Sequence, residues 1–136
     1  MIIHHEGTKG TKGSALALSH AVIGAAIEVH RTIGPGLLES IYEAALCREL
    51  WLRNIHVERQ VGVPVHYKGG ILDCGIKLDL LAEGSVIVEI KSVSKLAPIH
   101  RAQLLTYLRL QRLWLGLLIN FNVELLHDGV RRVLNG

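Results

Sequence analysis

The sequence predicts an α/β domain in which a central mixed β-sheet is flanked by helices. Three observations predict it. Residues 14–53 carry apolar residues at helical spacing, and residues 57–93 are rich in aliphatic and β-branched residues, with clear period-2 alternation in their first part. Helical spacing then returns after Pro98 and is followed by the apolar run 113–120. The expected order is α-α-β-β-β-α-β, followed by a C-terminal hairpin.

The first half of the chain divides at its glycines and prolines. A first helix is expected over 14–33 and ends at Gly34-Pro35-Gly36, and a second helix follows over 37–53. Residues 57–67 alternate like a half-exposed strand, and Pro64 favours an edge position. After a turn at 68–70, residues 71–81 and 85–93 predict two central strands joined by a turn at 82–85.

The second half of the chain again predicts a helix followed by strands. Pro98 suits the first turn of a third helix, expected to reach about residue 112. The run 113–120 predicts a buried strand, and residues 123–134 predict two short strands around Asp128-Gly129, a favoured hairpin turn.

Length and composition fit one domain. The chain has 136 residues, of which 49% are hydrophobic and 20% charged, enough for a core. Residues 1–13 show no periodicity and predict a flexible N-terminal arm before a single domain over 14–136. Aromatic residues, at 4%, are too few for a base-stacking platform, and the net charge of +3 is compatible with a polyanionic partner.

Location follows from what the sequence lacks. Cys47 and Cys74 have no metal spacing; two free thiols in a reducing compartment are the favoured interpretation, with a disulfide as the alternative. The N-terminus lacks the apolar segment of a signal peptide, and the longest uncharged stretch, 113–123, is too short to span a bilayer. We expect a cytoplasmic protein with no membrane partner.

Strand alternation places two carboxylates together. If the hairpin is centred on Gly84, Asp79 lies opposite Glu89, and their Cβ atoms are about 5 Å apart. Like charges so placed are unfavourable unless a divalent cation such as Mg²⁺ neutralises them. Lys91, on the face of Glu89, adds a cation, which is the chemistry of phosphodiester hydrolysis. On the motif alone, a solvated Glu-x-Lys ion pair is the favoured interpretation, and the aliphatic neighbours weaken it because an exposed face should carry more polar residues.

A resemblance adds to this interpretation. Gly36, Glu39 and Tyr42 match the signature of the GxxExxY protein family, and Asp79, Glu89-x-Lys91, Gln103 and Tyr107 follow in that family's order. The resemblance covers about residues 16–135. The family is grouped with the PD-(D/E)xK nucleases, which include restriction endonucleases, RecB-like exonucleases and archaeal Holliday-junction resolvases. It implies a restriction-endonuclease-like core.

The resemblance also implies roles. Asp79, Glu89 and a backbone carbonyl near Ile90 would bind Mg²⁺ or Mn²⁺, and Lys91 would be the catalytic lysine. Glu39 would reach the metal directly or through water, and Gln103 would orient the site. The proline expected before the first aspartate is Leu78 here.

Other readings stay open for several residues. Glu39 is also a favourable acid in a first helical turn, and Tyr42 shares its helix face. Gln103 and Tyr107 could equally be a buried pair. His30 is a minor candidate, since histidine near a helix C-terminus is common for electrostatic reasons.

We therefore expect a metal-dependent nuclease that acts on nucleic acid, with DNA favoured and a homodimer possible. The alternatives are an inactive nucleic-acid-binding or protein-interaction module on the same fold, and an oligomeric scaffold with Trp114 at its interface.

Overall fold

A five-stranded mixed sheet forms the centre of the structure, a computed structural model that describes residues 11–136. The strand order is β1-β4-β5-β6-β7, and only β5 and β6 run parallel. The elements are α2 (Lys12–Ile33), α3 (Glu39–Leu52), β1 (Val57–Gly62), β2 (Val65–Tyr67), β3 (Gly70–Leu72), β4 (Lys77–Ala82), β5 (Val86–Lys91), α4 (Pro98–Gln111), β6 (Leu115–Asn120), a 3-10 helix η1 (Leu126–Gly129) and β7 (Val130–Leu134).

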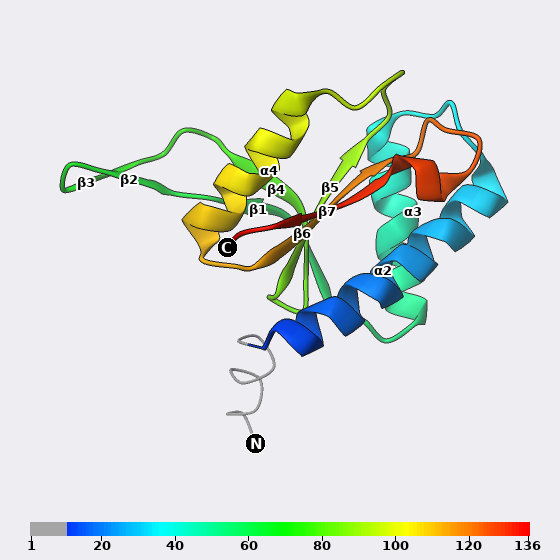
Figure 1. Ribbon diagram of the computed structural model, residues 1–136, viewed down its shortest axis with the longest axis horizontal. Coiled ribbons are helices and arrows are strands. Elements are labelled where there is room, and N and C mark those ends of the chain that lie inside the picture. Colours follow the sequence, from blue (N-terminus) through cyan, green and yellow to red (C-terminus); the bar gives the residue numbers. More distant parts are fainter. Residues whose placement is uncertain (1–10) are drawn as a thin grey trace.

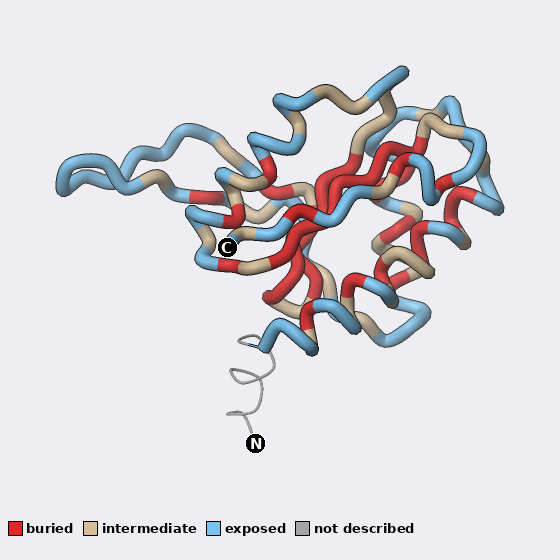
Figure 2. The backbone as a smooth tube through the Cα atoms, in the orientation of Figure 1, coloured by how far each residue is buried: buried red, intermediate tan, exposed pale blue. Residues whose placement is uncertain are grey.

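Helices cover both faces of this sheet (Figure 1). One face packs against α2 and α3 in a core that includes Val22, Leu46 and Ile90. The other face packs against α4, where Leu104 lies over Gly116 of β6, and a Cβ atom on that glycine would be 2.8 Å from the leucine. The central strands are therefore buried on both sides (Figure 2), and the predicted fold class is confirmed.

The register of the central hairpin also agrees with the prediction. Leu80 pairs with Val88, Leu81 with Ile87 and Ala82 with Val86, so the turn lies at Glu83 and Gly84. β1 is an edge strand, as Pro64 suggested, and its residues are half-buried or exposed.

Two predicted strands prove to be interrupted. The prediction of one strand over 71–81 was wrong, because residues 73–76 belong to no strand and separate β3 from β4. The strand expected over 57–67 likewise breaks at Val63 and Pro64, since proline has no N–H for the ladder. The detached parts, β2 and β3, pair only with each other around Lys68 and Gly69, and they project from the body.

The predicted C-terminal hairpin was also wrong. Asp128 and Gly129 close the 3-10 helix η1, and only β7 follows, antiparallel to β6. The glycine is there for a close approach: a Cβ on Gly129 would be 2.1 Å from the Asn120 carbonyl oxygen. Before it, Phe121 enters the core instead of continuing a strand.

The first helix is longer than expected. It begins at Lys12, with Thr11 as its side-chain cap, so residues 12 and 13 belong to the helix and not to the predicted flexible arm. The rest of that prediction, residues 1–10, lies outside the described residues. By length and composition α2 is also the one described helix that could span a membrane, but it buries Val22, Ala25 and Ala26 completely in the core.

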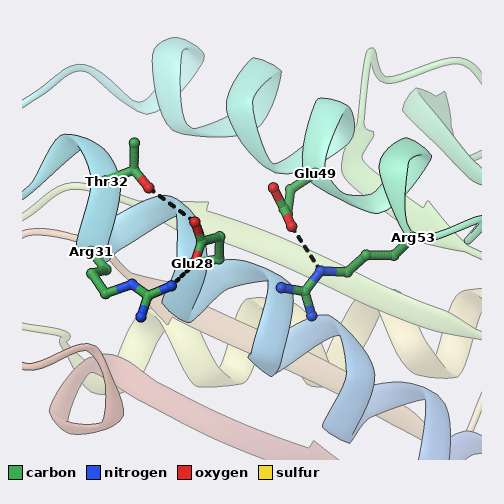
Figure 3. A network of polar contacts seen from close by, with 5 residues as sticks. All are labelled: Glu28, Arg31, Thr32, Glu49 and Arg53. Carbon is green, nitrogen blue, oxygen red and sulfur yellow. Dashed lines mark hydrogen bonds and ion pairs between the residues drawn. The ribbon is translucent and has the colours of Figure 1, made fainter.

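Polar pairs line the groove between α2 and α3 (Figure 3). Glu28 accepts hydrogen bonds from Arg31 and Thr32 on α2, and Arg53 donates to Glu49 on α3. Each pair lies within one helix at spacings of three or four residues, so it stabilises its own helix by a few tenths of a kcal/mol at most.

Candidate active site

Asp79 and Glu89 lie together where β4 and β5 stop pairing. The last backbone pair is Leu80 with Val88, one residue short of the two acids. Beyond it each carboxylate accepts a backbone N–H from the other strand. Asp79 N donates to Glu89 Oε2 at 2.9 Å, and Ile90 N donates to Asp79 Oδ2 at 2.8 Å. Side chains thus replace the missing ladder bonds and satisfy the backbone donors.

Burial makes this pair electrostatically costly. Burial, and then the negative charge of Asp79, raise the pKa of Glu89 from 4.5 to about 7. The pKa of Asp79 is also raised, by burial first and by Glu43 and Glu39 next, against a lowering hydrogen bond from Ile90. Two carboxylates that resist ionising side by side are typical of sites that bind a cation or exchange a proton.

Lys91 and Glu39 lie at the same end of the sheet. Lys91 is the half-buried last residue of β5, and its positive charge favours the ionised forms of both Asp79 and Glu89 by lowering their pKa values. Glu39 is the first residue of α3, and its Oε2 accepts the Ser92 N–H at 3.1 Å. Four of the residues predicted for the site therefore gather around the end of β5: Glu39, Asp79, Glu89 and Lys91.

The end of β5 is held in place by polar side chains that sequence reasoning did not single out. Ser92 Oγ donates to the Leu37 carbonyl oxygen at 2.6 Å and so links β5 to the start of α3. Asn120, which is buried, exchanges two hydrogen bonds with the backbone of Val93, at 3.0 and 2.9 Å. These bonds fix the segment that carries Lys91.

Tyr107 approaches the pair from the opposite helix layer. It is half-buried on α4, and burial together with the charges of Glu89 and Asp79 raises the pKa of its hydroxyl. Gln103 is exposed one turn earlier on the same face of α4. The buried Gln–Tyr pair considered from the sequence is therefore not formed, and Gln103 lies free to meet a ligand.

A sequence model of the PD-(D/E)XK nuclease superfamily matches residues 16–133, which include this whole site. The chain belongs to the PD-(D/E)XK nuclease superfamily. No curated protein and no solved structure matches the chain. The superfamily match confirms the broader part of the resemblance, whereas the GxxExxY assignment stays a prediction. Membership indicates a nuclease-type function and a nucleic acid substrate, and PD-(D/E)XK nucleases generally use divalent metals.

The donor set of this nuclease domain fits Mg²⁺ held by two carboxylates. Mg²⁺ prefers oxygen ligands, binds proteins through one or two carboxylates and keeps several waters. Asp79 and Glu89 are such a pair. Within residues 11–136, no group of three His, Cys, Asp or Glu side chains lies close enough to hold an ion by itself. Glu39 lies beside this pair with Oε2 bonded to Ser92 N, and its part in binding the metal, directly or through water, stays a prediction.

Glu43 is the acid that sequence reasoning missed. It is buried on α3, where Arg59 donates to Oε2 from both Nε and Nη2 at 3.2 Å and Gln60 donates to Oε1 at 2.9 Å. Its charge raises the pKa of Asp79 and Glu89. The available signal was spacing, since Glu43 lies four residues after Glu39 and so shares its helix face.

Backbone strain accompanies this contact. Gln60 has φ of 51°, a conformation that residues other than glycine rarely adopt. The β1–β4 register would place it opposite Asp79, but pairing is made only by the residues on either side, Arg59 and Val61. Strained residues of this kind cluster at functional sites, where the surrounding structure holds them.

Two predicted candidates make contacts that support the fold. The Tyr42 hydroxyl accepts from Leu37 N at 3.1 Å and donates to Gly34 O at 2.5 Å, and its ring stacks on Phe121. It therefore closes the loop before α3 and does not bond Glu39. His30 is buried on α2, where its Nε2 lies 2.7 Å from the Val123 carbonyl oxygen. That bond is one a structural histidine would make, and a part for His30 in the site stays a prediction.

Proposed function

We propose that this chain is a Mg²⁺-dependent nuclease that hydrolyses phosphodiester bonds, with DNA as the favoured substrate. One observation carries the proposal: beyond the Leu80–Val88 pair, the buried Glu89 and half-buried Asp79 carboxylates replace the hydrogen-bond ladder between β4 and β5. Such a pair is unfavourable for folding, because burial and mutual repulsion oppose ionisation. A divalent cation offsets both costs, and superfamily membership supplies the matching chemistry.

The roles follow from position. Asp79 and Glu89 hold Mg²⁺ or Mn²⁺, with the backbone carbonyl of Ile90 as a further ligand. The ion, when bound, lowers the pKa of a water and polarises the phosphate. Lys91 stabilises negative charge that develops on the phosphate oxygens, in a partly water-excluded site where this effect is strong.

Residues from the two helices complete the site. Glu39 orients a water near the carboxylate pair, and its hydrogen bond from Ser92 keeps it at the end of β5. Gln103 is the polar group on α4 that contacts the substrate.

Substrate, location and assembly are part of the proposal. DNA is favoured because the nucleases that the sequence resembles, such as restriction endonucleases, act on DNA. A cytoplasmic location is supported by Cys47 and Cys74, which are free thiols. A homodimer would place two sites on two strands. Trp51 is 64% exposed, with the Arg48 guanidinium over its ring, and tryptophan is common at protein interfaces.

A cleavage assay on DNA and RNA panels with Mg²⁺, Mn²⁺ or EDTA tests the proposal. Cleavage should require the metal and fall at least about 100-fold in Asp79→Asn, Glu89→Gln and Lys91→Ala, the scale of losing a group that stabilises the transition state. The matched control is Glu124→Gln, which removes an exposed carboxylate far along the chain from these residues. It should leave the rate unchanged.

Two results would decide for the alternatives. Tight nucleic acid binding without cleavage under any metal would identify an inactive binding module. An oligomer that dissociates in Trp114→Ser, with neither cleavage nor binding in the wild type, would identify a scaffold. Trp114 is half-buried here, beneath Lys12, at 5.2 Å from the ammonium to the ring centre.

A further inference from the structure

The hairpin of β2 and β3 is an exposed apolar element with no partner among the residues that the structure describes. It forms its own two-stranded sheet of three residue pairs. Tyr67, Ile71 and Leu72 are 58%, 68% and 42% exposed, and the hairpin stands clear of both helix layers (Figures 1 and 2). An isolated two-stranded hairpin is marginally stable in water, so this one gains most from a surface that covers it.

The base of the hairpin is fixed relative to the candidate active site. Val63 is buried in the core on the α4 face, and its N–H donates to the Ile76 carbonyl oxygen at 2.9 Å. From Ile76 the chain enters β4 directly, and Asp79 is the third residue of that strand. The hairpin is therefore continuous with a strand that carries a catalytic candidate, and a ligand bound by one is within reach of the other.

The chemistry of the hairpin fits nucleic acid. Lys68 stands at the tip with its ammonium 5.4 Å from the Tyr67 ring centre, His66 lies beside them, and Lys77 is exposed at the base. The one acid between these cations, Asp73, accepts the Gly75 N–H at 3.4 Å. A two-stranded ribbon fits the major groove, and apolar side chains such as isoleucine wedge between bases in the minor groove.

We propose that the projecting hairpin, residues 65–72, inserts into a groove of a duplex nucleic acid while the duplex backbone lies at Asp79 and Glu89. The inference rests on the proposed function and adds how the substrate is held. From Val63 to Lys68 the chain spans at most about 17 Å, which is roughly five base pairs of duplex. The hairpin thus contacts the duplex several base pairs from the bond that is cut.

Binding to a labelled DNA duplex of roughly 30 base pairs, longer than this reach, tests the inference in EDTA, where no cleavage occurs. The full chain carries Tyr67→Ser with Ile71→Ser, or Lys68→Gln alone. The double variant should weaken binding at least about tenfold. Lys68→Gln should lower the salt dependence by about one phosphate contact. Leu125→Ser, a change at a similarly exposed apolar residue outside the hairpin, should bind as the wild type does.

Two further measurements separate the possible failures. Cleavage of bis(p-nitrophenyl) phosphate, too small to reach the hairpin, should be equal in all variants, and sedimentation should show an unchanged oligomeric state. Unchanged duplex binding in both hairpin variants would overturn the inference, as would weaker binding that accompanies loss of a dimer. A wild type that binds duplex through the hairpin but cleaves neither substrate would overturn the proposed function and leave this inference standing.

Discussion

The two halves of the β4–β5 hairpin are built by opposite rules. Near the turn, Leu80, Leu81 and Ala82 pair regularly with β5 through apolar residues that are buried on both faces. Toward the other end the pairing stops, and carboxylates accept the backbone N–H groups of Asp79 and Ile90. The half near the turn buries apolar side chains. The half that carries Asp79 and Glu89 places charged side chains where apolar ones would be more stable.

The difference shows that stability and function favour different residues at the end of this hairpin. By strand alternation Asp79 and Glu89 share a face with Leu81 and Ile87, so apolar residues would suit their positions. Charge at these positions lowers stability and is explained by what it can bind. Substitutions in the two halves should therefore have opposite effects on stability and activity.

The largest effect on stability is expected in the turn half. Leu80→Ala removes a completely buried side chain and should lower the free energy of unfolding by about 2–5 kcal/mol in urea titrations. Asp79→Asn, one residue away, should leave stability unchanged or raise it at neutral pH while it abolishes metal-dependent cleavage. Equal destabilisation by the two variants would contradict this division, because Asp79 would then contribute to stability as much as Leu80 does.

The next effect is a pH dependence that originates in the site half. The folded pKa of Glu89, about 7, lies above its ordinary value of 4.5, so the folded protein holds the proton more tightly than the unfolded chain. The free energy of unfolding should therefore fall as the pH rises from about 4.5 to 7, by up to about 3 kcal/mol, and stay low above that window. Thermal unfolding of the metal-free protein across this range measures it.

Glu89→Gln and Mg²⁺ are the matched tests of that origin. The variant should flatten most of the pH dependence and raise the melting temperature above pH 7, because it removes the buried charge. Mg²⁺ should stabilise the wild type more at pH 8 than at pH 5, and stabilise Glu89→Gln little at either pH. A pH dependence that persists unchanged in Glu89→Gln would assign it to other groups.

The same division explains what the sequence could predict. The turn half, the sheet and the helices follow from apolar periodicity, because burial of one face dictates register and element type. Interruptions at residues 63–64 and 73–76 were missed because apolar residues flank them closely, and only Pro64, Asp73 and Gly75 interrupt the pattern. Asp128-Gly129 misled because its glycine serves a close approach to Asn120, which no local pattern reveals.

The part of the site that strand register determines could be predicted from the sequence. The prediction that Asp79 lies opposite Glu89 needs only the turn position and alternation. Glu43 escaped because its importance comes from Arg59 and Gln60, which reach it from a strand distant in sequence, with a strained backbone at Gln60. The contact of His30 could not be predicted because its partner, the Val123 carbonyl, lies 93 residues away.

A smaller effect tests whether α3 holds the site half in place. Ser92→Ala removes the hydroxyl bond to the Leu37 carbonyl and should cost about 1 kcal/mol of stability. Cleavage should fall more than in Ser40→Ala, an exposed serine on α3, because losing the hydroxyl bond loosens the segment whose backbone N–H holds Glu39. Equal cleavage by both variants would show that the site half needs no support from α3.

The smallest effect concerns the charge of Glu43. Glu43→Gln keeps one oxygen that can accept from Arg59 but removes the charge that raises the pKa of Asp79 and Glu89. The pH window of the stability loss should therefore move to lower pH, and stability at pH 8 should change by only a few tenths of a kcal/mol, about the scale of one charge acting through a high effective dielectric. Paired pH titrations of wild type, Glu43→Gln and the exposed-carboxylate control Glu124→Gln measure this difference. If Glu43→Gln does not move this pH window, the titration of the pair depends on residues of β4 and β5 alone. If the window moves to lower pH, the charge of Glu43 on α3 contributes to it.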